Sequence, residues 1–577
     1  MCIRDRLYSK SKLLNAINNP DEPLPENTNN VDDSVFKIKP KAEVIKGLKG
    51  KAKKAALHKW RLQKRAAREA KRNASGPQHI SAPVRALGQV LTMTKTVSLN
   101  YAENYNSLVP GYMDSTKLLG QNLRSMQPGF DYVFGRQPDS NWLNRKAAQG
   151  LFTHDKTFNL FFQQGLTQNL NINAQLEPIK EFTIDLNLQK SFSKQYTEEF
   201  KDTTGLGNYG HLSPYATGGF SVSYISFQTL FGNFNPKQVS VTFQKFQNNR
   251  AIISQRLASS NTYWKQLPLA QQYNGDGTAA GYGRYAQNVL IPAFIAAYTN
   301  KDARTIGLVK ETNSNIKSNP FSSIPPLPNW RINYTGLGKI PALAEIFTNI
   351  SVTHAYSSTL SMNSFTSALN YYDPLHLGSP AFIDSVSGNY VPYFLVPNIT
   401  IQEQFQPLIG FDVTTKNQAS FRFQYVKSRQ LSLSLVDYQL SEVRSTGWTF
   451  GASYNKKGLN LPFKLPFSKG KKLSNDLKLS LDLQVRDDTQ SNSTLDQATS
   501  YSTGGQKVIT IQPAVDYVMS NRVRIKFYFD QIKTIPYIST SAPITNTRAG
   551  MQINISLTPN TGNGQGGNNA NNTNGIK

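Results

Sequence analysis

The sequence predicts an all-β protein, the wall of an antiparallel transmembrane β-barrel, with a helical insert and a basic helical loop. Three observations support this prediction. Residues 476–488 alternate without a break between aliphatic and polar side chains. The same alternation recurs in strand-length stretches through the C-terminal half. The longest apolar run, near residues 289–297, is too short for a transmembrane helix of about 20 residues.

Residues 476–488 define the pattern. Successive side chains of a strand point to opposite faces, so this stretch has one aliphatic face and one polar face. A soluble sandwich with the aliphatic face in its core would look the same. The recurrence favours a barrel, with the aliphatic face in lipid and the polar face in a wet lumen. The side chains expected to face lipid are Leu477, Leu479, Leu481, Leu483, Val485, Val523, Ile525, Phe527 and Phe529. Those expected to face the lumen are Lys478, Asp482, Gln484 and Arg486.

About thirteen strands fit this alternating template. They begin near Val97, Leu170, Phe182, Phe220, Trp330, Ile350, Ile399, Phe421, Trp448, Asp476, Ile509, Val523 and Met551. Bacterial single-chain barrels have an even number of strands and short periplasmic turns. Counting back from the C-terminus puts the turns at 416–418 and 519–521 on the periplasmic side, but the short turn at 177–181 on the other. We therefore expect a missed strand between residues 231 and 397, with 304–311 and 383–394 as candidates.

Residues 233–328 break the alternation and predict a helical insert. Within them, Val239, Phe243, Phe246, Ile253 and Leu257 lie at helical spacing, and 285–298 is a second helix candidate. The insert is too long to be a plain turn, so we expect a folded element that caps the barrel mouth or packs in the lumen. It separates barrel strands and loops at 74–232 from the C-terminal strands at 329–558.

Charge is distributed unevenly along the 577 residues, which carry a net charge of +27 and have a mean hydropathy of −0.44. Residues 37–73 form a basic helical loop, in which 15 Lys and Arg face only Glu43 and Glu69. Such a segment is typical of nucleic-acid or anionic-lipid binding. Without interleaved aromatic residues or a nucleic-acid motif, we favour a solvated loop at the membrane edge.

The two ends of the chain predict little folded structure. Residues 1–36 are expected to be the start of a fragment and a polar linker, and 559–577 a disordered tail rich in Asn and Gly. Cys2 is the only cysteine, so an intrachain disulfide is excluded. Residues 1–6 resemble a translated sequencing adapter, and no signal peptide follows them. We therefore expect the chain to be the C-terminal fragment of a longer protein.

Motifs for catalysis are missing from the sequence. The six histidines are scattered, and there is no zinc-protease, nucleophile-elbow or P-loop motif. Residues 205–210 match the G-x-G-x-x-G dinucleotide fingerprint, but a strand rather than a helix is expected after them. Residues 274–277 supply a single carboxylate, too few oxygen ligands for calcium. We expect no enzyme activity, cofactor or metal.

Several composite motifs resemble a known family. They are Pro110-Gly111-Tyr112 with Ser115-Thr116-Lys117, Pro128-Gly129-Phe130 with Val133-Phe134-Gly135, Leu176-Glu177-Pro178 with Phe182-Thr183-Ile184-Asp185-Leu186, residues 292–298, and Asn329-Trp330-Arg331-Ile332-Asn333-Tyr334. From about Tyr101 to Leu557 the chain resembles the C-terminal part of the SprA family, also called Sov. This resemblance implies the closing portion of a very large barrel.

Membership of that family would also imply a function and a location. The family forms the outer-membrane translocon of the type IX secretion system in Bacteroidota. It exports folded cargo to the cell surface, including proteins needed for gliding motility. The implied partners are the cargo, a shuttle barrel protein, a periplasmic plug protein and outer-membrane lipid, with no nucleic acid.

Two other functions remain open from the residues. The first is a porin or solute-transporting receptor barrel, which would need an N-terminal plug domain if it were TonB-dependent. The second is a basic nucleic-acid-binding protein, which only the basic residues 37–72 support. Heat-modifiable migration on a gel separates a barrel from the latter, and the upstream sequence of the gene separates the two barrels.

Overall fold

A computed structural model describes residues 44, 47, 50–74, 93–139, 141–311, 315–458, 476–497, 499–519, 523–538 and 541–556. The chain divides into two units. The first comprises Met1–Lys95 and Leu176–Lys180, and the second comprises Thr96–Gln175 and Glu181–Lys577. In the first unit, the basic segment forms helix α4 (Gly50–Ala74), as predicted. The predictions for residues 1–36, 37–43 and 559–577 lie outside the described residues.

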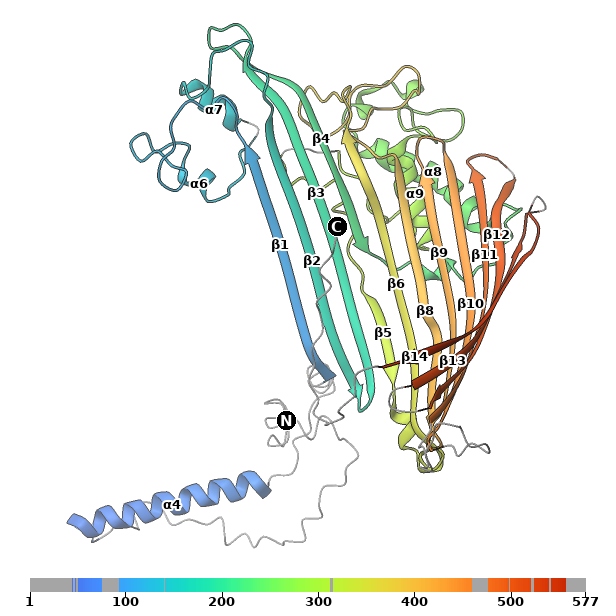
Figure 1. The fold of residues 1–577 in the computed structure, drawn as a ribbon. Helices are drawn as coiled ribbons and strands as arrows, with labels where there is room; N and C mark the ends of the chain where they lie inside the picture. The colour runs from blue at the N-terminus through green and yellow to red at the C-terminus, as the bar shows by residue number, and fades with distance from the viewer. Residues whose placement is uncertain are drawn as a thin grey trace. The chain divides into compact units, whose positions relative to one another are not determined.

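The second unit is dominated by a 14-stranded sheet in the order β1-β2-β3-β4-β6-β8-β9-β10-β11-β12-β13-β14, with β5 and β7 off this path (Figure 1). The strands are β1 (Thr94–Leu108), β2 (Phe162–Ile179), β3 (Phe182–Asp202), β4 (Tyr209–Ser223), β5 (Asn329–Tyr334), β6 (Phe347–Ser367), β7 (Phe394–Leu395), β8 (Asn398–Thr415), β9 (Ala419–Ser434), β10 (Gln439–Lys456), β11 (Asp476–Thr494), β12 (Ser500–Val518), β13 (Val523–Pro536) and β14 (Ile544–Ile555). From β3 to β14 the pairs are antiparallel. The predicted all-β wall of antiparallel strands is therefore confirmed.

Strands β4 and β5 together occupy one position in the sheet. Both pair with β3 on one side and β6 on the other, β4 with one half of each and β5 with the other half. The backbone N–H of Leu327 donates to the carbonyl of Ser223 at 2.8 Å, so the chain leaves the sheet after β4 and returns almost where it left. Residues 224–328 are thus spliced into the middle of a single wall strand.

The strand that was expected between residues 231 and 397 is present only as β7, which has two residues and lies off the main path of the sheet, and the splice accounts for the odd count of wall strands. Counting β4 and β5 as one position leaves twelve wall positions in the described part of the chain, and the β2–β3, β8–β9 and β12–β13 connections fall at the same end of the sheet. We call it the turn end, and the opposite end the insert end. Residues 304–311 form no strand, and residues 383–394 contribute two isolated bridges and the start of β7.

The predicted helices of the insert are confirmed. Helix α8 (Val241–Ser260) starts at Ser240, whose hydroxyl accepts from the N–H of Phe243 at 3.1 Å. Helix α9 (Gln287–Tyr298) is buried from Asn288 to Tyr298. Both helices pack with β4, β6, β8, β9 and β10 in one hydrophobic core, on one side of the sheet (Figure 1). Short helices α6 (Phe130–Val133), α7 (Trp142–Ala148) and α10 (Pro341–Ala344) lie in the connections.

The insert does not pack on the polar face of the sheet, as a position in the lumen would require. Opposite residues of an antiparallel pair point to the same face, so the register traces each face across the sheet. Leu431 and Leu433 of β9, which lie in the core with the insert, have the same parity as Phe421 and Phe423. Phe423 lies opposite Phe450, and Phe450 lies opposite Leu483. The insert therefore covers the face that carries the predicted lipid-facing residues, and a lumen position for it is incompatible with lipid contact for them.

Candidate functional site: the two faces of the sheet

All nine predicted lipid-facing residues lie on one face, which we call the apolar face. Leu477, Leu479, Leu483 and Val485 lie opposite Tyr517, Val515, Ile511 and Ile509 of β12. Tyr517 and Val515 in turn lie opposite Ile525 and Phe527, and these opposite Ile553 and Met551 of the last strand. The register thus joins the separate apolar repeats into a continuous surface. Its contact with lipid stays a prediction.

Near the turn end the apolar face is bare in the described part of the chain. Large side chains with substantial exposure there include Ile409, Phe411, Phe421, Trp448, Phe450, Tyr454, Leu479, Phe527, Met551 and Ile553. On β9 this bare stretch runs from Ala419 to about Lys427, close to the roughly 9–11 residues that a tilted strand needs to cross a bilayer. We call this surface the bare band. Farther along the same strand, Leu433 is 0% exposed beneath the insert.

Aromatic and charged residues lie at the edge of the bare band that is nearer the insert end. Tyr425 and Trp448 stack with their ring centroids 4.1 Å apart. Amphipathic rings are enriched where a membrane meets water, so this pair lies where an interfacial girdle belongs. Lys427 follows two residues beyond Tyr425, and its ammonium lies 4.8 Å from the ring centroid of Phe231 in the insert.

A buried ion pair anchors the insert to the wall just beyond this edge. The side chains of Arg429 (β9) and Glu403 (β8) are both 0% exposed, and the Arg429 Nε donates to Glu403 Oε1 at 2.6 Å. The insert supplies two further contacts. The Ser226 hydroxyl donates to Glu403 Oε2 at 2.6 Å, and Arg429 Nη2 donates to Thr229 Oγ1 at 2.8 Å. Buried charges are tolerated only with such partners, so these residues fix the insert to the sheet.

A second ion pair repeats this arrangement on the neighbouring strand. Arg444 of β10 donates to Glu442 at 2.6 Å and to the carbonyl of Gly232 in the insert at 3.2 Å. Its guanidinium also lies 4.2 Å from the ring centroid of Phe234. Sequence reasoning missed this anchor. The sequence feature that could have revealed the anchor is a cation among the apolar positions of each of two adjacent strands, Arg429 on β9 and Arg444 on β10.

The opposite face of the sheet, which we call the polar face, carries the four predicted lumen residues. Lys478, Asp482, Gln484 and Arg486 alternate with the leucines of β11 and lie opposite Asn455, Gly451, Thr449 and Gly447 of β10. Next to them, Arg422 (β9) donates to Asp412 (β8) at 2.7 Å. The register therefore places these four residues on one face, and their contact with a lumen stays a prediction.

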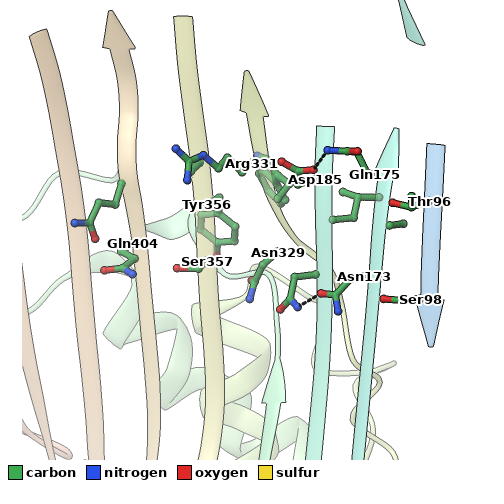
Figure 2. Close-up of a pocket in the computed structure, with 16 residues that line it drawn as sticks. Thr96, Ser98, Asn173, Gln175, Asp185, Asn329, Arg331, Tyr356, Ser357 and Gln404 are labelled. Atoms are coloured by element: carbon green, nitrogen blue, oxygen red, sulfur yellow. Dashed lines mark hydrogen bonds between the residues drawn. The ribbon is translucent and has the colours of Figure 1, made fainter. Parts of the chain in front are cut away.

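An amide-rich groove runs across the polar face on β1, β2, β3, β5, β6 and β8 (Figure 2). Its labelled polar side chains are Thr96, Ser98, Asn173, Gln175, Asp185, Asn329, Arg331, Ser357 and Gln404. The Gln175 amide donates to Asp185 at 3.0 Å, and the Asn187 amide donates to Asn173 at 2.5 Å. Amides both donate and accept hydrogen bonds, so the groove suits water or a hydrophilic chain.

The buried carboxyl of Glu311, in the insert, has a shifted pKa. Burial raises the pKa of Glu311 to about 7, although its carboxylate accepts hydrogen bonds from the Asn288 amide at 2.5 Å and the Tyr393 N–H at 2.7 Å. Lys194 of β3 is buried under the insert. The Lys194 ammonium donates to the carbonyl of Asn315 at 3.0 Å.

The glycine-rich turn at 203–208 is a hairpin loop between β3 and β4. The N–H groups of Thr204, Gly205 and Gly207 donate to the Asp202 carboxylate at 3.1, 2.8 and 2.7 Å. Burial works against the charged form, yet these bonds and one from His154 hold the pKa of Asp202 well below its ordinary value. The loop thus folds around its own carboxylate, and no helix follows it in this stretch of described chain.

Within the described ranges, no His, Cys, Asp and Glu side chains gather as a metal site would require. Among the described helices, none combines the length and apolarity needed to cross a membrane. What the described residues offer is therefore an extended two-faced surface rather than a compact site.

Comparison with known proteins identifies no family. No family model matches the chain, and no curated protein does. Six chains of solved structures match. One is described as OmpT, an outer membrane protein of Vibrio cholerae folded in vitro, in its trimer form. It aligns over 68% of this chain and 92% of its own length, with 9% identity and a TM-score of 0.17. A TM-score of 0.17 is too low for the two folds to be treated as equivalent. The assignment of the fold therefore rests on the strand register.

Proposed function

We propose that this chain forms the wall of an outer-membrane β-barrel. The observation that carries the proposal is the bare band, which has the height of a membrane, is apolar on one face and is polar on the other. In lipid, every backbone polar group needs a partner within the protein, which a sheet can provide only by closing. Two longer connections, at 109–161 and 368–397, lie at the insert end. Because the longer loops of bacterial barrels are extracellular, the insert end would face outward.

The finer proposal is that the barrel is the protein-conducting channel of the type IX secretion system, exporting folded proteins to the cell surface, including those needed for gliding. The resemblance of residues 101–557 to the SprA family supports it. A lumen lined by the polar, amide-rich face would suit hydrophilic cargo. The partners would be the cargo, a shuttle barrel protein and a periplasmic plug.

A second candidate is a porin or solute receptor barrel. The described sheet favours it, because its twelve wall positions are an even number, as in bacterial single-chain barrels.

Disruption of the gene in its native host tests the two candidates together. The channel proposal expects secreted proteins to accumulate in the periplasm and gliding to stop, with recovery on complementation by the intact gene. The porin proposal expects normal surface proteins and slower uptake of a small solute. Unchanged secretion and gliding in the disrupted strain would rule out the translocon.

A further inference from the structure

The charges of the polar face largely alternate in sign across neighbouring strands, and Arg486 is paired along its own strand with Asp488 at 2.9 Å. The chain as a whole carries +27, so an excess of cations on this face would be the simple expectation. Instead, Arg422 is bonded to Asp412 at 2.7 Å. Gly451 separates Arg422 from Asp482 in the register, and a Cβ at Gly451 would lie only 3.0 Å from the Asp482 carboxylate. The glycine therefore leaves room for Asp482 to lean toward β9 and Arg422.

The same alternation continues to the last strand. Lys478 of β11 lies opposite Asp516 of β12, which lies opposite Lys526 of β13. Farther along β13, Asp530 pairs with Arg548 of β14 at 2.9 Å. Arg524, near the start of β13, is an exception, since it lies opposite Val518 and Asn554.

The amide-rich groove follows the same rule. Its two charged side chains, Asp185 of β3 and Arg331 of β5, lie directly opposite each other. Acids and bases on adjacent strands are separated by about 5 Å, less than the Debye length of about 8 Å at physiological salt. Their fields therefore largely cancel at the distance of a passing solute. Channels that select ions by charge instead carry rings of one sign.

We propose that this polar face is a charge-balanced lining that does not discriminate between cations and anions, and that it admits hydrophilic substrates of either charge. The inference rests on the proposed barrel, with this face toward the lumen. It excludes a binding protein for one charged solute, which would need an unbalanced cluster.

Charged thiol reagents test the balance directly in the full-length chain. Cys2 is the only cysteine, so a Cys2→Ser background accepts a single new thiol. Ser453→Cys places this thiol on the polar face, opposite Ser420 and Ser480. Its reaction rates with a cationic and an anionic methanethiosulfonate are compared with those of a free thiol. The neighbouring Ala452→Cys, on the apolar face, is the matched control and should resist both water-soluble reagents.

The two rates at Ser453→Cys, each normalised to the free thiol, should agree within about threefold. Adding Asp482→Asn should then favour the anionic reagent, and adding Arg422→Gln the cationic one. A bias above about tenfold before those changes would overturn the balanced lining and leave the barrel intact. If Ser453→Cys reacted with neither reagent while Ala452→Cys reacted with both, the faces would be reversed and the proposed barrel itself would fail.

Discussion

Replacing Leu481 by Arg is the sharpest perturbation of the bare band. Leu481 lies on the apolar face near the centre of the repeat Leu477–Val485, opposite Ala452 and Pro513. A guanidinium at a lipid-facing mid-membrane position costs about 2–4 kcal/mol. Since each 1.4 kcal/mol is tenfold, the folding equilibrium should fall roughly 30- to 1000-fold.

Asp482→Arg is the matched control on the next residue. Asp482 lies on the polar face beside Gly451, so the new guanidinium would remain in water. The main cost is lost attraction to Arg422, and exposed pairs contribute about 0–1 kcal/mol. The two variants therefore add the same side chain to the same strand in opposite environments.

Urea unfolding of the protein in lipid vesicles, with heat-modifiable gel migration as the sign of a folded barrel, measures both variants. Leu481→Arg should lower the unfolding midpoint markedly or prevent insertion, and Asp482→Arg should leave it nearly unchanged. Equal losses in the two variants, or a larger loss for Asp482→Arg, would refute the assignment of the faces.

Two further predictions concern the insert. Arg429→Ala leaves the Glu403 carboxylate buried without its cation, a loss of about 3–5 kcal/mol that should appear as protease sensitivity of the insert. Arg422→Ala removes an exposed pair and should cost at most about 1 kcal/mol in the same assay; equal sensitivity would mean that the buried pair is no anchor. Burial raises the pKa of Glu311 from 4.5 to about 7, so its contribution to stability is complete below pH 4.5 and is lost as the pH rises through 7. The insert of the native protein should become more protease-sensitive between pH 5 and pH 8, and Glu311→Gln should abolish this change; a Glu311→Gln insert with the same pH dependence would show that another group titrates.

Strand parity could be predicted from the sequence because the side-chain period of a strand is fixed. Each apolar residue from Leu477 to Val485 lies on the expected face for this reason. The two helices of the insert were also predictable, because apolar residues such as Phe246 and Ile253 recur at helical spacing and are fully buried.

The sequence could not predict which part of the apolar face is bare and which part lies beneath the insert. Phe423 and Leu433 have the same parity on the same strand, yet one lies in the bare band and the other beneath the insert. Lipid and a protein core select the same aliphatic residues, so alternation does not distinguish them. The splice was hidden for another reason. Ser223 and Leu327 meet through a single backbone hydrogen bond, which leaves no trace in side-chain pattern.

Thiol labelling at three positions of β9 tests the central claim, that one strand face passes from lipid to a protein cover. Phe423→Cys, Gln424→Cys and Leu433→Cys are made one at a time in the Cys2→Ser background. Each is treated in native membranes with a lipid-soluble and a membrane-impermeant maleimide. We expect Phe423→Cys to react only with the lipid-soluble reagent and Gln424→Cys to react with the membrane-impermeant reagent. Leu433→Cys should react with neither. Labelling of Phe423→Cys by the impermeant reagent, with Gln424→Cys protected, would contradict the central claim.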